Sequence, residues 1–203
     1  SVGLALLQIY QSYEEKPYQI NHHFITNGNI YLPLAQLTRA QNLFLNPIIG
    51  PFLSTITPGE LFAEGLTEST FESIVPQSEV DSYASIFEYQ NGTAVQHEII
   101  EYLNERSDNE VAWLEALSNS DIPTTIIWGE LDAIAPVAVP DHAWENYLID
   151  RETPASYWRI PCANHYLQVD EPEVIVEIIR TTRTEFQVGT EITKEIRTAE
   201  CGP

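Results

Sequence analysis

The stretch IPTTIIWGELDAIAP, residues 122–136, decides the fold of this chain. Its centre, residues 124–128, is apolar and β-branched without polar alternation, which predicts a strand buried on both faces of a parallel sheet. Gly129 ends the run, and Asp132 follows in the loop at the carboxyl end of the strand, where open α/β sheets bind their ligands. The pattern therefore predicts an α/β fold with a functional carboxylate at that edge.

A second strand candidate leads to a histidine. Residues 156–161 form an apolar and aromatic run, and Cys162-Ala163-Asn164-His165 follows it directly. Because the carboxyl ends of parallel strands meet at one edge of a sheet, we expect Asp132 and His165 within hydrogen-bonding reach. A histidine alone is more often a satisfied loop or core residue, but a partner carboxylate favours the base and the orienting acid of a catalytic triad. The candidate catalytic residues are therefore Asp132 and His165.

Five short motifs carry a resemblance to a known family. The chain contains WGELD at 128–132, ANHYLQVDEP at 163–172, TNGNIY at 26–31, EYLNER at 101–106 and WLEAL at 113–117. In this order they resemble the epoxide hydrolase and haloalkane dehalogenase branch of the α/β-hydrolases, in particular the mesoderm-specific transcript protein-like hydrolases. The likeness covers nearly the whole chain apart from its tail.

The resemblance implies the C-terminal part of an α/β-hydrolase fold, a parallel sheet flanked by helices, with an inserted helical cap. It also implies hydrolysis of a small organic substrate, an epoxide, haloalkane or ester, through a nucleophile–histidine–aspartate triad with no cofactor. The cap departs from the family at Asn104-Glu105-Arg106, where epoxide hydrolases carry a tyrosine in the sequence Asn-Trp-Tyr-Arg. That departure puts epoxide opening in doubt.

The nucleophile is the triad member that the sequence leaves open. Residues 1–13 place apolar side chains on one helical face, and in the resembled family this helix follows the nucleophile turn. We therefore expect the nucleophile upstream of residue 1 and the chain alone to be incomplete and inactive. Alternatively, Ser1-Val2-Gly3 ends a Gly-x-Ser-x-Gly elbow, and Ser1 is the nucleophile of a serine esterase. A further alternative is a non-catalytic or truncated module that only binds.

The chain divides into four predicted segments. Residues 1–30 are expected to form a core helix and strand, and residues 31–120, with short helical stretches broken by prolines and glycines, a cap or lid. Residues 121–183 should form the last core strands and helices with the acid and histidine loops, ending in a helix over 173–182. Residues 184–203 form a tail, either an added strand or disordered.

Aromatic residues and histidines supply the remaining candidates. Tyr83 and Trp113 are candidate substrate-binding residues of the cap, because such rings combine apolar area with a polar group, although core packing is the commoner role for either one. His22 and His23 should point to opposite faces of a strand over 18–26, so we interpret them as structural. No metal site is predicted.

Charge excludes several classes of partner. The chain has 9 basic and 30 acidic side chains, a net charge of −21, which repels nucleic-acid phosphates and anionic membranes. No apolar run approaches the ~20 residues that span a bilayer. Cys162 lies in the histidine loop and Cys201 in the tail, so we predict no disulfide framework and a cytoplasmic location. The expected partner is a small-molecule substrate, and a homo-oligomer is left open.

Overall fold

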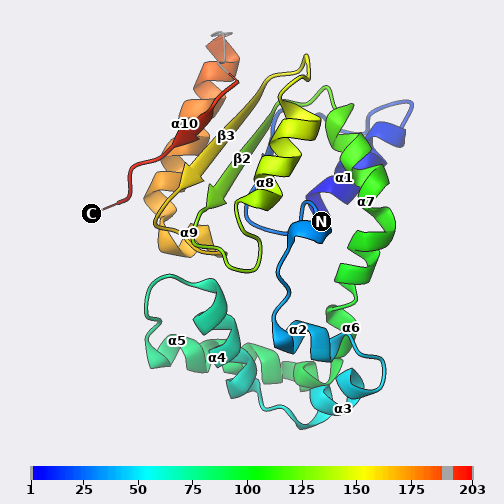
Figure 1. The fold of residues 1–203 in the computed structure, drawn as a ribbon, viewed down its shortest axis with the longest axis vertical. Coiled ribbons are helices and arrows are strands. Elements are labelled where there is room, and N and C mark those ends of the chain that lie inside the picture. The colour runs from blue at the N-terminus through cyan, green and yellow to red at the C-terminus, as the bar shows by residue number, and fades with distance from the viewer. Residues whose placement is uncertain (1, 189–193, 203) are drawn as a thin grey trace.

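A four-stranded parallel sheet lies at the centre of the computed structural model, which describes residues 2–188 and 194–202. Its strands follow the order β1-β2-β3-β4 and comprise His23–Ile25, Thr124–Gly129, Ala155–Ile160 and Ile196–Thr198 (Figure 1). All three neighbouring pairs run parallel, so their carboxyl ends share one edge. The strands predicted around 124–128 and 156–161 are present, whereas the strand predicted over 18–26 shrinks to the three residues of β1.

Helices cover both faces of the sheet (Figure 1). One face is covered by α1 (Val2–Ser12), by α7 (Tyr102–Ser118) and by α8 (Ala138–Ala143), which continues into the π-helix η3 (Trp144–Leu148). The other face is covered by α9 (Leu167–Asp170) and α10 (Pro172–Val188). This is the layered α/β architecture that a buried parallel sheet requires.

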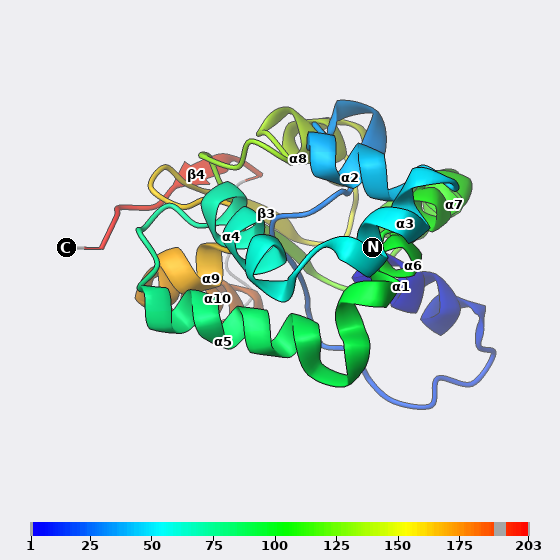
Figure 2. The same ribbon diagram turned by 90° about the horizontal axis from the view of Figure 1, so that it is seen from below.

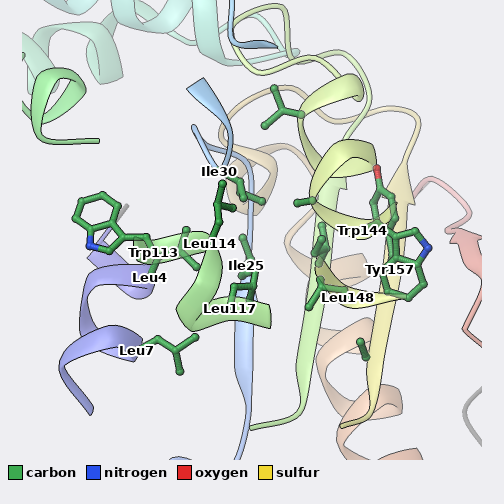
Figure 3. Close-up of a cluster of buried hydrophobic side chains, with 14 of the residues drawn as sticks. Leu4, Leu7, Ile25, Ile30, Trp113, Leu114, Leu117, Trp144, Leu148 and Tyr157 are labelled. Carbon is green, nitrogen blue, oxygen red and sulfur yellow. The ribbon is translucent and has the colours of Figure 1, made fainter. Parts of the chain in front are cut away.

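The larger core cluster lies between the sheet and the first group of helices (Figure 3). Ile25, Ile126 and Tyr157 stand opposite one another on three neighbouring strands and therefore point to the same face. Side chains from the helices, Leu7 and Leu117 among them, cover this row. Burying each such side chain fully contributes about 1.5–3 kcal/mol, so the two faces together fix the sheet between its helices.

Helix α1 ends with a cation at its carboxyl terminus. Its buried residues Leu4, Leu7 and Tyr10 recur every third residue and face the core. The ammonium group of Lys16 then donates to three carbonyl groups at this end of the helix: those of Tyr10, Gln11 and Tyr13. A positive charge at this end also complements the helix dipole, which explains why the helix ends at Ser12.

Residues 31–120, all of them described, add no strand to the sheet. They form short helices beyond its carboxyl edge, which Figure 2 views from that side. Before α7 these are η1 (Leu32–Leu34), α2 (Arg39–Phe44), α3 (Ile49–Ile56), α4 (Gly59–Thr70), α5 (Gln77–Glu88), η2 (Tyr89–Val95) and α6 (Gln96–Ile99). The helix α7 begins among them and ends in the core, so a continuous helix joins these short helices to the layers around the sheet.

Helix α10 is longer than predicted, and the tail after it contains a strand. The helix runs to Val188 rather than stopping at Thr182, since the sequence offers no helix breaker before Gly189. In the described part of the tail, β4 pairs with β3, which is the added strand that was one of the two predicted alternatives.

The prediction that the two cysteines form no disulfide framework is wrong. Cys162 and Cys201 form a disulfide, with Cα atoms 6.0 Å apart across a sequence separation of 39 residues. The pairing of β4 with β3 brings the tail beside the histidine loop, a contact that sequence distance hides. Disulfides persist in oxidising environments, so this bond weighs against the predicted cytoplasmic location. None of the described helices is long and apolar enough to cross a bilayer.

Candidate active site

Asp132 lies in the loop after β2 and is 2% exposed. Its Oδ1 accepts hydrogen bonds from the backbone N–H groups of Ile134, at 2.9 Å, and Ala135, at 2.8 Å. Its Oδ2 lies 2.7 Å from His165 Nδ1 and accepts a second hydrogen bond from Asn27 Nδ2 at 2.8 Å. Each oxygen therefore has two donors, which fixes the plane of the carboxylate.

Asp132 stays ionised although it is buried. Burial by itself raises the pKa of its carboxyl group, but the hydrogen bond and the charge interaction with His165 oppose this, joined by donors from Ala135 and Asn27. Together they hold the pKa of Asp132 below its ordinary value. The site therefore presents a carboxylate, rather than a neutral acid, to the imidazole.

Two loops interlock to place this pair. The N–H of Leu131 donates to the carbonyl of Ala163 at 3.0 Å, and the N–H of Glu130 donates to that of Ile160 at 2.9 Å. A Cβ atom on Gly129 would lie 2.4 Å from the Ala163 oxygen. Only glycine lets the two loops approach so closely, so the Gly that ends β2 is a condition for the Asp132–His165 contact.

His165 is held from both sides of its own loop. Its N–H donates to Asn164 Oδ1 at 2.8 Å, and the N–H of Asn164 donates to Asp170 Oδ2 at 2.8 Å. The imidazole is 21% exposed, and among the described residues its Nε2 forms no hydrogen bond. With the Nδ1 proton directed at Asp132, Nε2 carries the free lone pair, as a general base requires.

Asn27 belongs to the site, although its place in the sequence predicts no role for it. It follows β1 at the same sheet edge, and its Oδ1 accepts from the N–H of Gly129 at 2.7 Å. Its Nδ2 donates to the Gly129 carbonyl at 3.3 Å as well as to Asp132. The side chain thus ties the ends of two strands to the carboxylate. An amide just after an edge strand, level with a predicted acid loop, is the sequence signal that could have identified it.

The turn after α4 is bonded directly to the histidine loop. The N–H of Tyr166 donates to the Thr70 carbonyl at 3.1 Å, and the N–H of Glu72 donates to Asp170 Oδ1 at 3.1 Å. The rings of Phe71 and Tyr166 stack with centroids 5.3 Å apart. The sequence predicted only that Asp170 lies at the start of the following helix. In the structure it joins the turn after α4 to the loop that carries His165.

The two predicted substrate-binding residues lie in different places. Tyr83, on α5, faces Phe71 with ring centroids 6.0 Å apart, and so lies on the side of the cap that meets the histidine loop. Trp113 is 7% exposed within the larger core cluster (Figure 3). The Arg106 guanidinium lies over its ring, 5.2 Å from the centroid. The structure therefore brings Tyr83, and not Trp113, towards His165.

Two curated proteins are similar to the chain at low identity, and one of them is named a hydrolase. No protein-family model matches the chain. It is 26% identical over 163 residues to "Putative hydrolase LipZ" of Mycobacterium tuberculosis, covering 79% of this chain and 54% of that protein. It is also 26% identical over 137 residues to mouse (Mus musculus) mesoderm-specific transcript protein, covering 66% of this chain and 41% of that protein. The chain spans about half the length of the curated relatives it matches.

Superposition on solved structures identifies the fold of the chain. Haloalkane dehalogenase DbeA from Bradyrhizobium elkani USDA94 superposes with a TM-score of 0.70 at 13% identity, over 93% of this chain and 66% of that one. An alpha/beta hydrolase fold protein from Burkholderia ambifaria gives a TM-score of 0.62 at 18% identity, over 87% of this chain and 61% of that one. Together with the parallel sheet flanked by helices, they confirm the predicted class: the chain has the α/β-hydrolase fold.

Proposed function

We propose that this chain carries the base and the orienting acid of a hydrolase that acts on a small organic substrate. The observation that carries the proposal is the 2.7 Å contact between His165 Nδ1 and a buried, fully hydrogen-bonded Asp132 at the carboxyl edge of the sheet. Such a pair stabilises the imidazolium that forms when Nε2 takes a proton. The hydrolase relatives support the reaction class.

The nucleophile is proposed to lie in a part of the protein other than the residues that the structure describes. The Nε2 atom of His165 is free to face it, and β1, beside Asn27, forms one edge of the sheet among the described strands. A groove of about 320 Å³, lined by Gly3, Phe24 and Asn27 among others, runs along that edge. The alternative nucleophile, Ser1, lies outside the described residues.

His165 serves either kind of nucleophile. If a carboxylate attacks carbon, it displaces a halide or opens an epoxide and forms an alkyl ester, and Nε2 then takes a proton from the water that hydrolyses this ester. If a serine attacks an acyl carbon, Nε2 takes the serine proton and returns it to the leaving alkoxide. The relatives include both a dehalogenase and a lipase by name, so the two routes remain candidates for the experiment.

The phenol groups of Tyr83, Tyr102 and Tyr166 are the side chains proposed to contact the substrate. Tyr166 follows His165, and their rings meet edge to face at 5.5 Å. Burial raises the pKa of Tyr166, with Tyr83 nearby adding to the effect, and burial together with Tyr166 raises the pKa of Tyr102. These phenols therefore stay protonated at neutral pH and can donate to a substrate oxygen. An uncharged substrate also suits a protein with a net charge of −21.

The test uses the gene product that contains these 203 residues, together with the 203-residue chain by itself. We expect the longer protein to hydrolyse a member of an epoxide, haloalkane and p-nitrophenyl ester panel, and Asp132→Asn and His165→Ala to lower turnover by ~10³–10⁴-fold. The chain alone should be inactive and poorly soluble, and it should recover when the remaining part is supplied. Turnover that survives both substitutions would overturn the proposal. Turnover by the chain alone that both abolish would make Ser1 the leading nucleophile.

A single turnover in ¹⁸O water separates the two routes. A carboxylate nucleophile gives its own oxygen to the product, so the label appears first in the enzyme. A serine nucleophile leaves the label in the released acid. A protein that binds panel compounds without converting any of them would instead be the non-catalytic module.

A further inference from the structure

The last residues of the tail are bonded to the histidine loop at both of its ends. Cys201 is bonded to Cys162, where the chain enters the loop, and the N–H of Gly202 donates to Glu171 Oε2 at 3.0 Å, where the chain leaves it. Residues 162–171 between these two points contain His165. We name these two contacts, Cys201–Cys162 and Gly202–Glu171, the tail clasp.

Several non-covalent contacts also attach the tail. The strand β4 has three residues, its Ile196 is 40% exposed, and one further backbone bond, from the N–H of Ala199 to the Arg159 carbonyl at 2.8 Å, extends the pairing with β3. Arg197 pairs with Glu185 at 2.9 Å and its guanidinium lies 5.0 Å from the centroid of the Trp158 ring, while Lys194 Nζ donates to the Arg151 carbonyl. The partners in these contacts all lie outside residues 162–171, so the disulfide is the covalent tie between the tail and the histidine loop.

We propose that the Cys162–Cys201 disulfide is a redox-sensitive control on the position of His165. In the oxidised protein the clasp holds the loop in the geometry that places Nδ1 against Asp132. In the reduced protein the tail leaves β3 and the loop opens locally, which weakens that contact. The inference deepens the proposed function, because it adds regulation to the same site, but its physical basis is independent of any turnover.

The chemistry of the switch is a thiol–disulfide exchange. A dithiol reductant attacks one sulfur as a thiolate, forms a mixed disulfide and displaces the other cysteine as a thiolate. Its second thiol then closes an intramolecular disulfide and releases the first cysteine. Two electrons and two protons pass from the reductant to Cys162 and Cys201. Exchange with an oxidised disulfide such as oxidised glutathione reverses the reaction.

The test follows hydrogen exchange and thiol content in the full chain. Iodoacetamide should label neither cysteine of the aerobically purified protein and both cysteines after dithiothreitol. Reduction should speed amide exchange over residues 163–167 by at least about tenfold, and oxidised glutathione should restore protection. The Nδ1 proton of His165, which NMR observes directly when it is hydrogen-bonded to Asp132, should broaden in the reduced protein and sharpen on reoxidation.

The C162S/C201S double variant is the matched control. It should exchange as fast as the reduced protein, and dithiothreitol should change nothing further. Glu171→Gln, which weakens only the second contact, should give a smaller increase. Free thiols in the aerobically purified protein, or equal exchange over 163–167 before and after reduction, would overturn the inference.

A metal is the other occupant that the three side chains could accept. The sulfurs of Cys162 and Cys201 and a carboxylate oxygen of Glu171 lie within 4.8 Å of one another. If Zn²⁺ restored protection to the reduced chain while C201S did not respond, the clasp would be a metal clip and the disulfide control would be wrong. A clasp that responds to reduction in a protein without hydrolase activity would leave the inference standing and reject the proposed function alone.

Discussion

At the scale of single residues, the site rests on a carboxylate whose hydrogen-bonding capacity is filled. A buried charge is unfavourable unless donors replace its lost hydration. Asp132 receives two backbone donors on Oδ1 and two side-chain partners, His165 and Asn27, on Oδ2. Asn27 is the member of this set that approaches from another strand, across 105 residues of sequence.

Replacing Asn27 should reveal its part in holding the acid. Asn27→Ala leaves the N–H of Gly129 without its 2.7 Å acceptor and removes one of the four donors to Asp132, so we expect a loss of about 1–3 kcal/mol in the free energy of unfolding. Urea denaturation at pH 7 measures it. An unchanged free energy would show that water replaces the amide fully.

Asn27→Asp tests the same contact by charge. Two carboxylates at this distance repel, so the new group should have a raised pKa in the folded protein. When the pKa of a carboxyl group is higher in the folded protein than in the unfolded chain, the folded protein loses stability as pH rises through the folded pKa. We therefore expect the destabilisation relative to the wild type to be larger at pH 7 than at pH 5. Asn27→Ala, which adds no titrating group, should show no such trend.

At the scale of elements, close contacts between loops set the geometry. The loop after β2 and the loop after β3 touch through backbone atoms, and the turn after α4 is bonded to the second of them. No side chain of ordinary size fits between the first two loops at Gly129. The position of His165 therefore depends on the cap as well as on the sheet.

Gly129→Ala should separate the two loops. Its Cβ atom would lie 2.4 Å from a backbone oxygen that cannot move by a side-chain rotation, so we expect a loss of more than about 2 kcal/mol. Gly65, inside α4, is the matched control, because a Cβ there meets nothing within 4 Å. Gly65→Ala should stabilise the chain by about 0.5–1 kcal/mol. Equal effects of the two substitutions would contradict this account.

Asp170→Asn should loosen the joint between the cap and the histidine loop. An amide keeps one acceptor oxygen where the carboxylate offers two, so either Glu72 or Asn164 loses its partner. We expect a loss of about 1.5–3 kcal/mol and faster amide exchange in both segments. Asp81→Asn removes the same charge from α5, where the aspartate accepts an exposed hydrogen bond from Gln77. If both variants exchange alike, net charge rather than the joint explains the change.

At the scale of the whole molecule, the chain combines strong acidity with a partly buried pair of histidines. His22 Nε2 contacts Thr125 Oγ1 at 2.8 Å and its ring stacks on Phe24, while His23 Nδ1 is buried without a partner among the described residues. Burial, first of all, lowers the pKa of both to about 4, with positive neighbours such as Arg151 adding to the effect at His23. Both therefore fit the structural role predicted for them.

The histidines should make stability fall in mild acid. Their pKa is about 6.5 in the unfolded chain and about 4 in the folded protein, so the unfolded state binds more protons between these values. The free energy of unfolding should therefore decrease as pH falls from 6.5 towards 4, by about 1–2 kcal/mol per histidine after allowance for partial exposure. His23→Gln should reduce this decrease. Because variant and wild type are compared at each pH, the contribution of net charge cancels. At pH 8 the free energy of unfolding should change with pH equally in both proteins.

Local patterns in the sequence determined much of this protein. The apolar run before Gly129, the run before Cys162 and the loop residues Asp132 and His165 predicted two buried parallel strands and the sheet edge at which both side chains lie. The α/β-hydrolase class was implied by the resemblance of five short motifs to a known family. The two strands could be predicted because hydrophobic period, turn residues and strand polarity act over short windows.

Only the tertiary structure decided the contacts that finish the site. The clamp from Asn27 to Asp132 spans 105 residues, the bond from Asp170 to Glu72 spans 98, and the disulfide closes 39. The short length of β1 and the core position of Trp113 are likewise set by neighbours distant in sequence. Such contacts depend on how the layers pack against one another, and packing is a property of the whole chain that no local window contains.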